Sequence, residues 1–346
     1  MTDHRNALKD LGARLPILEK RAGFLREIRA YFTSEGFLEA DAPLLVPAAG
    51  MEPHLDPFEA KGWNSGARYL LPTSPEFYLK KLLAAGAKRC FSLAPSFRDE
   101  PPGRGHSPEF LMLEWYRTHA RLRELLADCG TLLKRLGTAL GAPAVPLPDG
   151  GSCRLSAGIE VFELSEAFEQ WAGVSWRVLD DVHAWREAAR RWGGDVNETW
   201  TENDCFSYLL LTRIEPALAR LDRPAALFGY PSFQGALARE REDDPGVIDR
   251  FELYAAGVEL ANAYQELTDG EEQRRRYAAY QEERLKQGKP PHPPDEEFFE
   301  AVDLLPECAG IALGADRLFA LLTGRTVLEV RHGTNGRWAA GEEVKS

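Results

Sequence analysis

The chain has 346 residues, of which 44% are hydrophobic and 28% are charged, and its formal net charge is −12. This composition excludes global disorder, and the acidic balance argues against stable nucleic-acid binding, because phosphate contacts need clustered lysine and arginine. The N-terminus lacks the apolar core of a signal peptide, and no apolar run approaches the roughly 20 residues of a membrane span. We therefore expect a cytoplasmic protein with no membrane partner.

The first third of the chain alternates helix and strand signals. Apolar spacing predicts a helix over residues 15–35, followed by an extended segment over 37–47. The sequence Thr-Ser-Pro-Glu at 73–76 is typical of a helix start. Residues 89–97 and 110–116 are predicted strands, joined by a Pro/Gly-rich loop.

The rest of the chain predicts an α+β fold with an antiparallel sheet flanked by helices. A helix over 122–140 is followed by a Pro/Gly-rich break, and the helical pieces up to residue 221 show few convergent polar groups. Strands are predicted at 225–230, 250–254, 258–261 and 310–313, and a surface helix at 271–289. We divide the chain into an extension at 1–15, a catalytic domain at 16–330 with a helical insertion at about 142–222, and a tail at 331–346.

A first cluster of chemical groups lies in FRDEPPGRGHSPEFLMLEWYR at residues 97–117. Arg98 and Glu100 are two residues apart, so they share a face if the backbone is extended, and an arginine fork there binds phosphate or carboxylate. The alternative is that the two pair with each other. His106 and Arg104 are placed to reach outer phosphates, and Phe110 offers a flat face for a base.

A second cluster is FELYAAGVELANAYQEL, at residues 251–267. Ala256-Gly257 suits a two-residue turn, which places Glu259 opposite Tyr254 and Glu252 on the same face. Two carboxylates so close repel each other unless a cation lies between them.

This repulsion favours Mg²⁺ over a salt bridge at Glu252 and Glu259. Asn262 reaches the same face as Glu259 only if the strand contains a bulge. The alternative interpretation is a pair of exposed glutamates at a sheet edge.

A third cluster is GIALGADRLFALLTG, a strand that enters a helix with Asp316 and Arg317 at its start. Arginine is unfavourable at the positive end of a helix dipole, so Arg317 is expected to bind an anion. Alternatively, Asp316 caps the helix and Arg317 extends along the surface.

These three segments together resemble class II aminoacyl-tRNA synthetases. FRDE with RGHSPEF resembles their motif 2, GADRLFALL resembles motif 3, and residues 36–47 look like motif 1. TSPEF, MLEWY and ELANAYQEL make the lysyl-tRNA synthetase core the best match, over about residues 16–329. The resemblance implies ATP and Mg²⁺ as cofactors and a homodimer formed through motif 1.

Within that superfamily the chain looks like the elongation factor P lysine ligases (the GenX/PoxA/EpmA family), which attach β-lysine to a protein lysine. About fifteen residues precede the first predicted helix, whereas a lysyl-tRNA synthetase carries an N-terminal anticodon-binding domain there. Ala312 stands where lysyl-tRNA synthetases usually have glycine, and its methyl group is expected to reshape the amino-acid pocket. The implied partners are elongation factor P and lysine or β-lysine.

The resemblance also implies a role for each candidate residue. The ATP ligands are Arg98, Glu100, His106, Phe110, Glu252, Glu259 and Arg317, with Arg98 and Arg317 as the catalytic arginines. The metal ligands are Glu252 and Glu259, and the amino-acid ligands are Glu76, Glu114, Tyr116, Asn262, Glu266 and Ala312. A buried ammonium needs carboxylate partners, which independently suits Glu114 and Glu266.

Two other functions compete with a protein-modifying ligase. A tRNA-charging enzyme is disfavoured by the acidic balance and by the expected lack of an anticodon domain. A non-catalytic paralogue that only binds ATP and an amino acid is disfavoured because both motif arginines, Arg98 and Arg317, are present.

Overall fold

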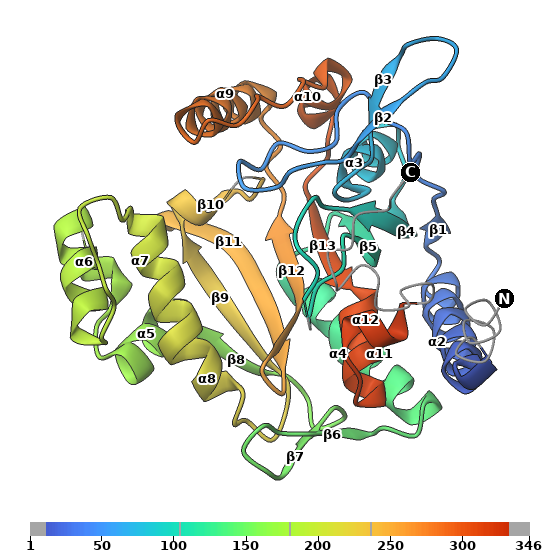
Figure 1. Ribbon diagram of the computed structural model, residues 1–346, viewed down its shortest axis with the longest axis horizontal. Helices are drawn as coiled ribbons and strands as arrows, with labels where there is room; N and C mark the ends of the chain where they lie inside the picture. Colours follow the sequence, from blue (N-terminus) through green and yellow to red (C-terminus); the bar gives the residue numbers. More distant parts are fainter. Residues whose placement is uncertain (1–11, 104, 180, 236, 332–346) are drawn as a thin grey trace, which may run out of the picture.

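One large sheet forms the centre of the molecule (Figure 1). The computed structural model describes residues 12–331 except 104, 180 and 236. Within these residues the nine-stranded sheet has the order β1 (Leu38–Glu39), β4 (Arg89–Phe97), β5 (Glu109–Thr118), β13 (Cys308–Gly314), β12 (Val258–Gln265), β11 (Asp244–Ala255), β9 (Ala225–Pro231) and β8 (Glu160–Glu163), with β10 (Glu240–Arg241) beside β11. Only the edge pairs β1–β4 and β8–β9 are parallel, so the predicted α+β antiparallel sheet is confirmed.

The two faces of the sheet differ in chemistry, as β5 illustrates. Leu113 and Trp115 are fully buried in the largest apolar core, whereas Glu114 and Tyr116 alternate with them. Because successive side chains of a strand point to opposite faces, this alternation gives the sheet one apolar and one polar face.

Two long helices cover the apolar face. They are α2 (Leu15–Ser34) and α4 (Leu122–Ala139), and both contribute buried side chains to the same core. Phe32 of α2 stacks on Phe91 of β4 at a ring-centroid distance of 4.7 Å. The helix predicted at 15–35 and the one predicted at 122–140 are thus confirmed to within a residue.

Helices around the polar face enclose the space above it. They are α3 (Glu76–Ala84), α9 (Gly270–Lys286), α10 (Glu296–Asp303), α11 (Ala315–Thr323) and α12 (Val327–Val330). Phe77 of α3 stacks on Phe298 of α10 at 3.9 Å. A hairpin of β2 (Glu59–Lys61) and β3 (Arg68–Leu70) projects beyond α3 in Figure 1.

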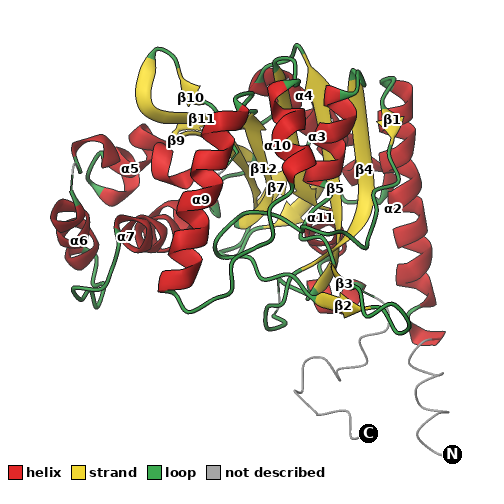
Figure 2. Cartoon of the chain, turned by 90° about the horizontal axis from the view of Figure 1, so that it is seen from above, coloured by secondary structure: helices red, strands yellow, loops and turns green. Residues whose placement is uncertain are grey.

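The predicted insertion is helical but not separate from the sheet. Its helices are α5 (Leu164–Ala172), η1 (Trp176–Val178), α6 (Val182–Arg191), α7 (Glu202–Leu209), η2 (Leu210–Ile214) and α8 (Glu215–Leu218), and η3 (Ser232–Gln234) follows β9. They gather at the end of the sheet opposite α2 (Figure 2) and share a second apolar core. A hairpin of β6 (Ala144–Pro146) and β7 (Ser152–Arg154), which was not predicted, spans the predicted break at 142–151, and β8 joins the main sheet.

The β11–β12 hairpin follows the sequence prediction in detail. Ala256 and Gly257 both have positive φ, 49° and 79°, as a tight hairpin turn requires. Glu259 lies opposite Tyr254, and the register then shifts so that Asn262 lies opposite Glu252. The predicted bulge is therefore present.

Several boundaries and segments need correction. The strands predicted at 250–254 and 258–261 extend to Asp244–Ala255 and Val258–Gln265, and α10 was not predicted. Arg104, the tail after 331 and most of the N-terminal extension lie outside the described residues. Among the residues described, no helix combines the length and hydrophobicity that a bilayer span requires.

Candidate active site

Four residues from distant parts of the chain form one row across the polar face. Glu114 of β5 lies opposite Ala312 of β13, which lies opposite Asn262 of β12, which lies opposite Glu252 of β11. Directly opposite residues in neighbouring strands are about 4.5–5.5 Å apart, so antiparallel pairing alone brings these four together.

A cavity of about 200 Å³ lies over this row. It brings together ten of the residues predicted from the sequence: Glu76, Arg98, Glu100, His106, Phe110, Glu114, Glu259, Asn262, Ala312 and Arg317. The remaining three, Tyr116, Glu252 and Glu266, do not line it but are buried beside residues that do. The three sequence clusters thus converge on one space.

At one end of the cavity, Glu76 and Glu114 line the wall, and Lys80 and Glu266 are buried directly behind them. The Lys80 ammonium lies 2.6 Å from Glu76 Oε1 and 2.7 Å from Glu266 Oε2, and only 1% of its side chain is exposed. Tyr116 donates a hydrogen bond of 3.2 Å to Glu114 Oε2. If all are ionised, three carboxylates and one ammonium leave this end with two negative charges to be balanced.

The pKa values of two of these carboxyl groups are raised. Burial raises the pKa of Glu114, and the neighbouring Glu76 carboxylate raises it further. Burial also raises the pKa of Glu266 to about 7, although Lys80 opposes that shift. Glu266 Oε1 is buried and accepts no hydrogen bond from the described residues. A buried carboxylate oxygen without a hydrogen-bond donor is stabilised when a cation binds beside it.

Gly310 of β13 makes this arrangement possible. A Cβ atom at this position would lie 2.1 Å from Tyr116 Cε1 and 2.3 Å from Glu266 Oε1. The absence of a side chain therefore allows the phenol and the carboxylate to approach each other across the strand.

Arg98, from the motif 2-like segment, lines the middle of the cavity. The Arg98 guanidinium carbon lies 5.1 Å from the centroid of the Phe110 ring, and Arg98 Nε is buried without a hydrogen-bond partner among the described residues. Arg98 and Glu100 follow the end of β4 rather than continuing it, so they do not share a strand face, although both line the cavity. No ion pair joins the two in the described structure, which leaves the guanidinium available to an anion.

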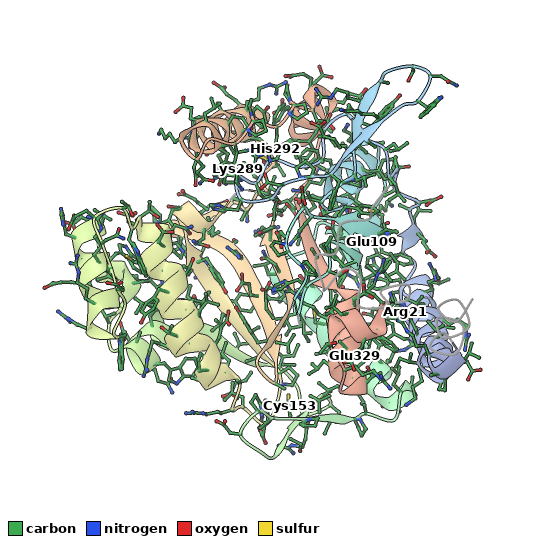
Figure 3. The ribbon with its side chains drawn as sticks, viewed as in Figure 1. Arg21, Glu109, Cys153, Lys289, His292 and Glu329 are labelled. Carbon is green, nitrogen blue, oxygen red and sulfur yellow. The ribbon has the colours of Figure 1, made fainter. Side chains whose placement is uncertain are left out.

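The other end of the cavity is closed by the start of α11. Arg317 donates to the Glu259 backbone oxygen at 3.2 Å and to Glu259 Oε2 at 3.5 Å, and its Nε donates to the Gly105 oxygen at 3.4 Å. Asp316 is buried, accepts from the Leu111 backbone nitrogen at 2.8 Å and pairs with Arg21 of α2 at 2.5 Å. Arg317 is thus held beside the motif 2-like loop by its hydrogen bonds to Gly105 and Glu259. Arg21, the partner of Asp316, is labelled in Figure 3.

The metal prediction needs one correction. Glu252 was expected to prefer a metal ion to a salt bridge, but it pairs with Arg250 and also accepts hydrogen bonds of 2.6 Å from Tyr230 and Tyr254. Burial and the Glu252 charge nevertheless raise the pKa of Glu259.

These oxygen donors suit a hard cation such as Mg²⁺, which usually takes one or two carboxylates together with substrate phosphates. In the described parts of the chain no three acidic, histidine or cysteine side chains are grouped to hold a metal by themselves. A Mg²⁺ ion at Glu252 and Glu259 would therefore need phosphate oxygens to complete its ligands.

Sequence reasoning missed three charged residues here. Lys80 gave a signal, because it lies one helical turn after Glu76. Glu52 lines the cavity from a loop without a recognisable motif. Glu215 starts α8 of the insertion, where no chemistry was expected, and burial with the charges of Glu252 and Glu259 raises its pKa to about 7.

Comparison with known families agrees with this geometry. A family model described as tRNA synthetases class II (D, K and N) matches residues 13–331, which include every candidate residue of the cavity. The chain therefore belongs to the class II tRNA synthetases (D, K and N), whose domain activates an amino acid with ATP.

Proposed function

We propose that the protein activates lysine or β-lysine with ATP and transfers it to a lysine side chain of elongation factor P. The observation that carries the choice of amino acid is the group of three buried carboxyl groups, Glu76, Glu114 and Glu266, which share one ammonium, that of Lys80, at one end of the cavity. A diamino acid supplies two ammonium groups, and a neutral side chain would leave buried carboxylates without partners.

The geometry supports a division of labour along the cavity. Glu114, Tyr116 and Glu266 would hold the distal ammonium, Glu76 the ammonium near the carboxylate, and Arg98 the carboxylate together with the α-phosphate. In-line attack by the substrate carboxylate then forms the aminoacyl-adenylate and releases pyrophosphate. Preorganised cations stabilise the charge that develops in this step.

The outer phosphates would lie toward Arg317 and His106. Both residues line the cavity, and Arg317 is fixed by Glu259 and by the motif 2-like loop. Glu252 and Glu259 would hold Mg²⁺, which neutralises phosphate charge when it is bound. Phe110 would stack on the adenine and Glu100 would accept its amino group.

An exchange assay tests the activation step. Pyrophosphate exchange is measured with α-lysine, both enantiomers of β-lysine, ornithine and the neutral norleucine. We expect exchange with at least one cationic amino acid and none with norleucine. No exchange with any cationic amino acid would overturn the proposal.

Acceptor assays decide the second step. The family match makes tRNA the second candidate acceptor, since its description names tRNA synthetases. Radiolabelled amino acid is incubated with ATP and either elongation factor P or tRNA. Label on elongation factor P supports the proposed acceptor, and label on tRNA alone replaces it.

We also propose a homodimer formed through the face that carries α2 and β1. Leu15, Leu38 and Leu45 on this side expose 56%, 55% and 56% of their surface. Large apolar side chains exposed on one side are a surface that a second copy of the chain would cover. Sedimentation equilibrium checks this: Leu38→Asp with Leu45→Asp should convert a dimer to a monomer, and a wild-type monomer would refute it.

A further inference from the structure

A second and larger cavity adjoins the first one. Its volume is about 830 Å³, and it lies among α6, α7, α9 and the loop at residues 52–55. Four residues line both cavities: Glu52, Arg98, Asn262 and Tyr264. If the smaller cavity holds the adenylate, an acceptor that enters through the larger one meets the activated carboxyl at these four side chains.

The four junction residues differ in what they offer an incoming amine. Arg98 repels a cation, and Asn262 is already engaged, since its amide donates to Tyr264 at 2.8 Å and accepts from Arg250 at 3.0 Å. Glu52 is the only carboxylate among the four. It is therefore the junction residue to which an ammonium is attracted.

The Glu52 side chain is oriented by its own loop. Its Oε2 accepts a hydrogen bond of 3.1 Å from the Met51 backbone nitrogen, while no described residue donates to its other oxygen. A Cβ atom at residue 50 would lie 3.0 Å from Oε2, so Gly50 leaves the carboxylate its space.

The loop in turn is fastened to α9 and the segment after it. Arg284 is buried and donates to the backbone oxygens of Pro53 and Leu55 at 2.9 and 3.2 Å. A ring nitrogen of His292 lies 3.3 Å from the Glu52 backbone oxygen, in the region labelled in Figure 3. A binding group held by buried partners is preorganised.

We propose that Glu52 receives the ammonium group of the acceptor and takes its first proton before the transfer step. This inference rests on the proposed function, because it needs an amine acceptor and an adenylate in the smaller cavity. The ligand class is a primary alkylammonium, such as a lysine side chain of a protein.

The proposed transfer moves two protons and replaces one C–O bond by one C–N bond. The ammonium gives one proton to the Glu52 carboxylate, and the neutral nitrogen attacks the carbonyl carbon of the adenylate. The new C–N bond forms as the bond between that carbon and the phosphate oxygen breaks, AMP leaves with the electron pair, and the second proton goes to the departing phosphate.

Two small acceptors separate the proposed proton transfer to Glu52 from the activation of the amino acid. Nα-acetyl-lysine methylamide carries an ammonium that must lose a proton, whereas hydroxylamine is neutral at pH 7.5 on general chemical grounds and needs no base. The yields of amide and hydroxamate are measured for wild type, Glu52→Gln and Glu52→Asp, with pyrophosphate exchange in parallel. Glu283→Gln is the matched control, because Glu283 lines only the larger cavity.

We expect Glu52→Gln to lower the amide-to-hydroxamate ratio at least roughly tenfold, within the usual range for a general base. Glu52→Asp should fall between Gln and wild type, and Glu283→Gln should keep the wild-type ratio. Normal pyrophosphate exchange with an unchanged amide-to-hydroxamate ratio in Glu52→Gln would overturn this inference alone. The same holds if the wild-type protein forms hydroxamate but no amide. No exchange in wild type would overturn the proposed function as well.

Discussion

The Lys80 ammonium lies 2.7 Å from Glu266 Oε2 at a place where both side chains are only 1% exposed. It also contacts Glu76, so a single buried cation serves two of the carboxylates that we assign to amine recognition. Breaking such a group leaves charges in the interior without a partner, which is costly.

We predict that Lys80→Met destabilises the fold by about 3–5 kcal/mol, because Glu76 and Glu266 lose their shared cation. Urea unfolding at pH 7 measures the change. The neighbouring Lys81 is partly exposed and pairs with Asp295 and the exposed Glu297, so Lys81→Met should cost less than Lys80→Met. Equal losses of unfolding free energy in the two variants would show that the buried ion pairs of Lys80 stabilise the fold no more than the ion pairs of Lys81.

Glu266→Gln should weaken amino-acid binding far more than ATP binding. The change removes a charge from the ammonium end of the cavity and leaves the Arg98 and Arg317 end intact. We expect the Kd for lysine to rise by roughly 10- to 100-fold, equivalent to about 1.5–3 kcal/mol for a hydrogen bond to a charged group. Separate calorimetric titrations measure both ligands, and comparable losses of the two affinities would refute the assignment.

Amino-acid binding should release a proton near pH 6. Burial raises the pKa of Glu266 from 4.5 to about 7, so part of the free protein carries a proton there that an incoming ammonium displaces. Calorimetry in two buffers of different ionisation enthalpy counts the proton, and Glu266→Gln should bind without releasing it.

The same pKa shift predicts how stability depends on pH. A raised acid pKa means that the folded state holds the proton more tightly than the unfolded chain. The stability from this proton is therefore complete below about pH 4.5 and is lost as the pH rises to about 7. Between these values, Glu266→Gln should flatten the fall in unfolding free energy relative to wild type, and parallel curves would contradict the shift.

Gly310→Ala should damage the amine pocket without touching the ATP end. The added methyl would overlap Tyr116 and Glu266, and forced repacking in a filled interior costs about 1–3 kcal/mol. Thermal unfolding measures the stability, and titration measures the two ligands. Retention of full lysine affinity would show that Tyr116 and Glu266 can move apart without weakening lysine binding.

Ala312→Gly should change the choice between lysine isomers. Ala312 lies opposite both Glu114 and Asn262, so its methyl projects into the row beneath the amino acid. Removing it makes room near the carboxylate, and we expect the ratio of α-lysine to β-lysine exchange to increase. Ala309→Gly, on the opposite face of the same strand, should lower stability but leave that ratio unchanged.

The sequence was most informative where function depends on local pattern. The turn at Ala256-Gly257 and the bulge before Asn262 followed from strand parity, because side chains alternate with a period of two. Antiparallel pairing then placed Asn262 beside Glu252.

The alternation of side chains along a strand does not predict which charged groups pair in the folded protein. The salt bridge of Glu252 with Arg250 was missed because parity places the two on one face but does not say whether they pair or bind a metal. The loop that carries Glu52 is held by Arg284 and His292, which lie more than two hundred residues later in the chain. No local signal in a single sequence reports such a contact.

The strand order has a consequence for how the protein is made. β13 is the last strand described along the chain, yet it lies between β5 and β12 in the sheet. During synthesis at roughly 5–20 residues per second, β5 and β12 must therefore wait with unpaired edges until residue 314 is available. Until then the row from Glu114 to Glu252 lacks Ala312, and the open strand edges are exposed to pairing with other chains.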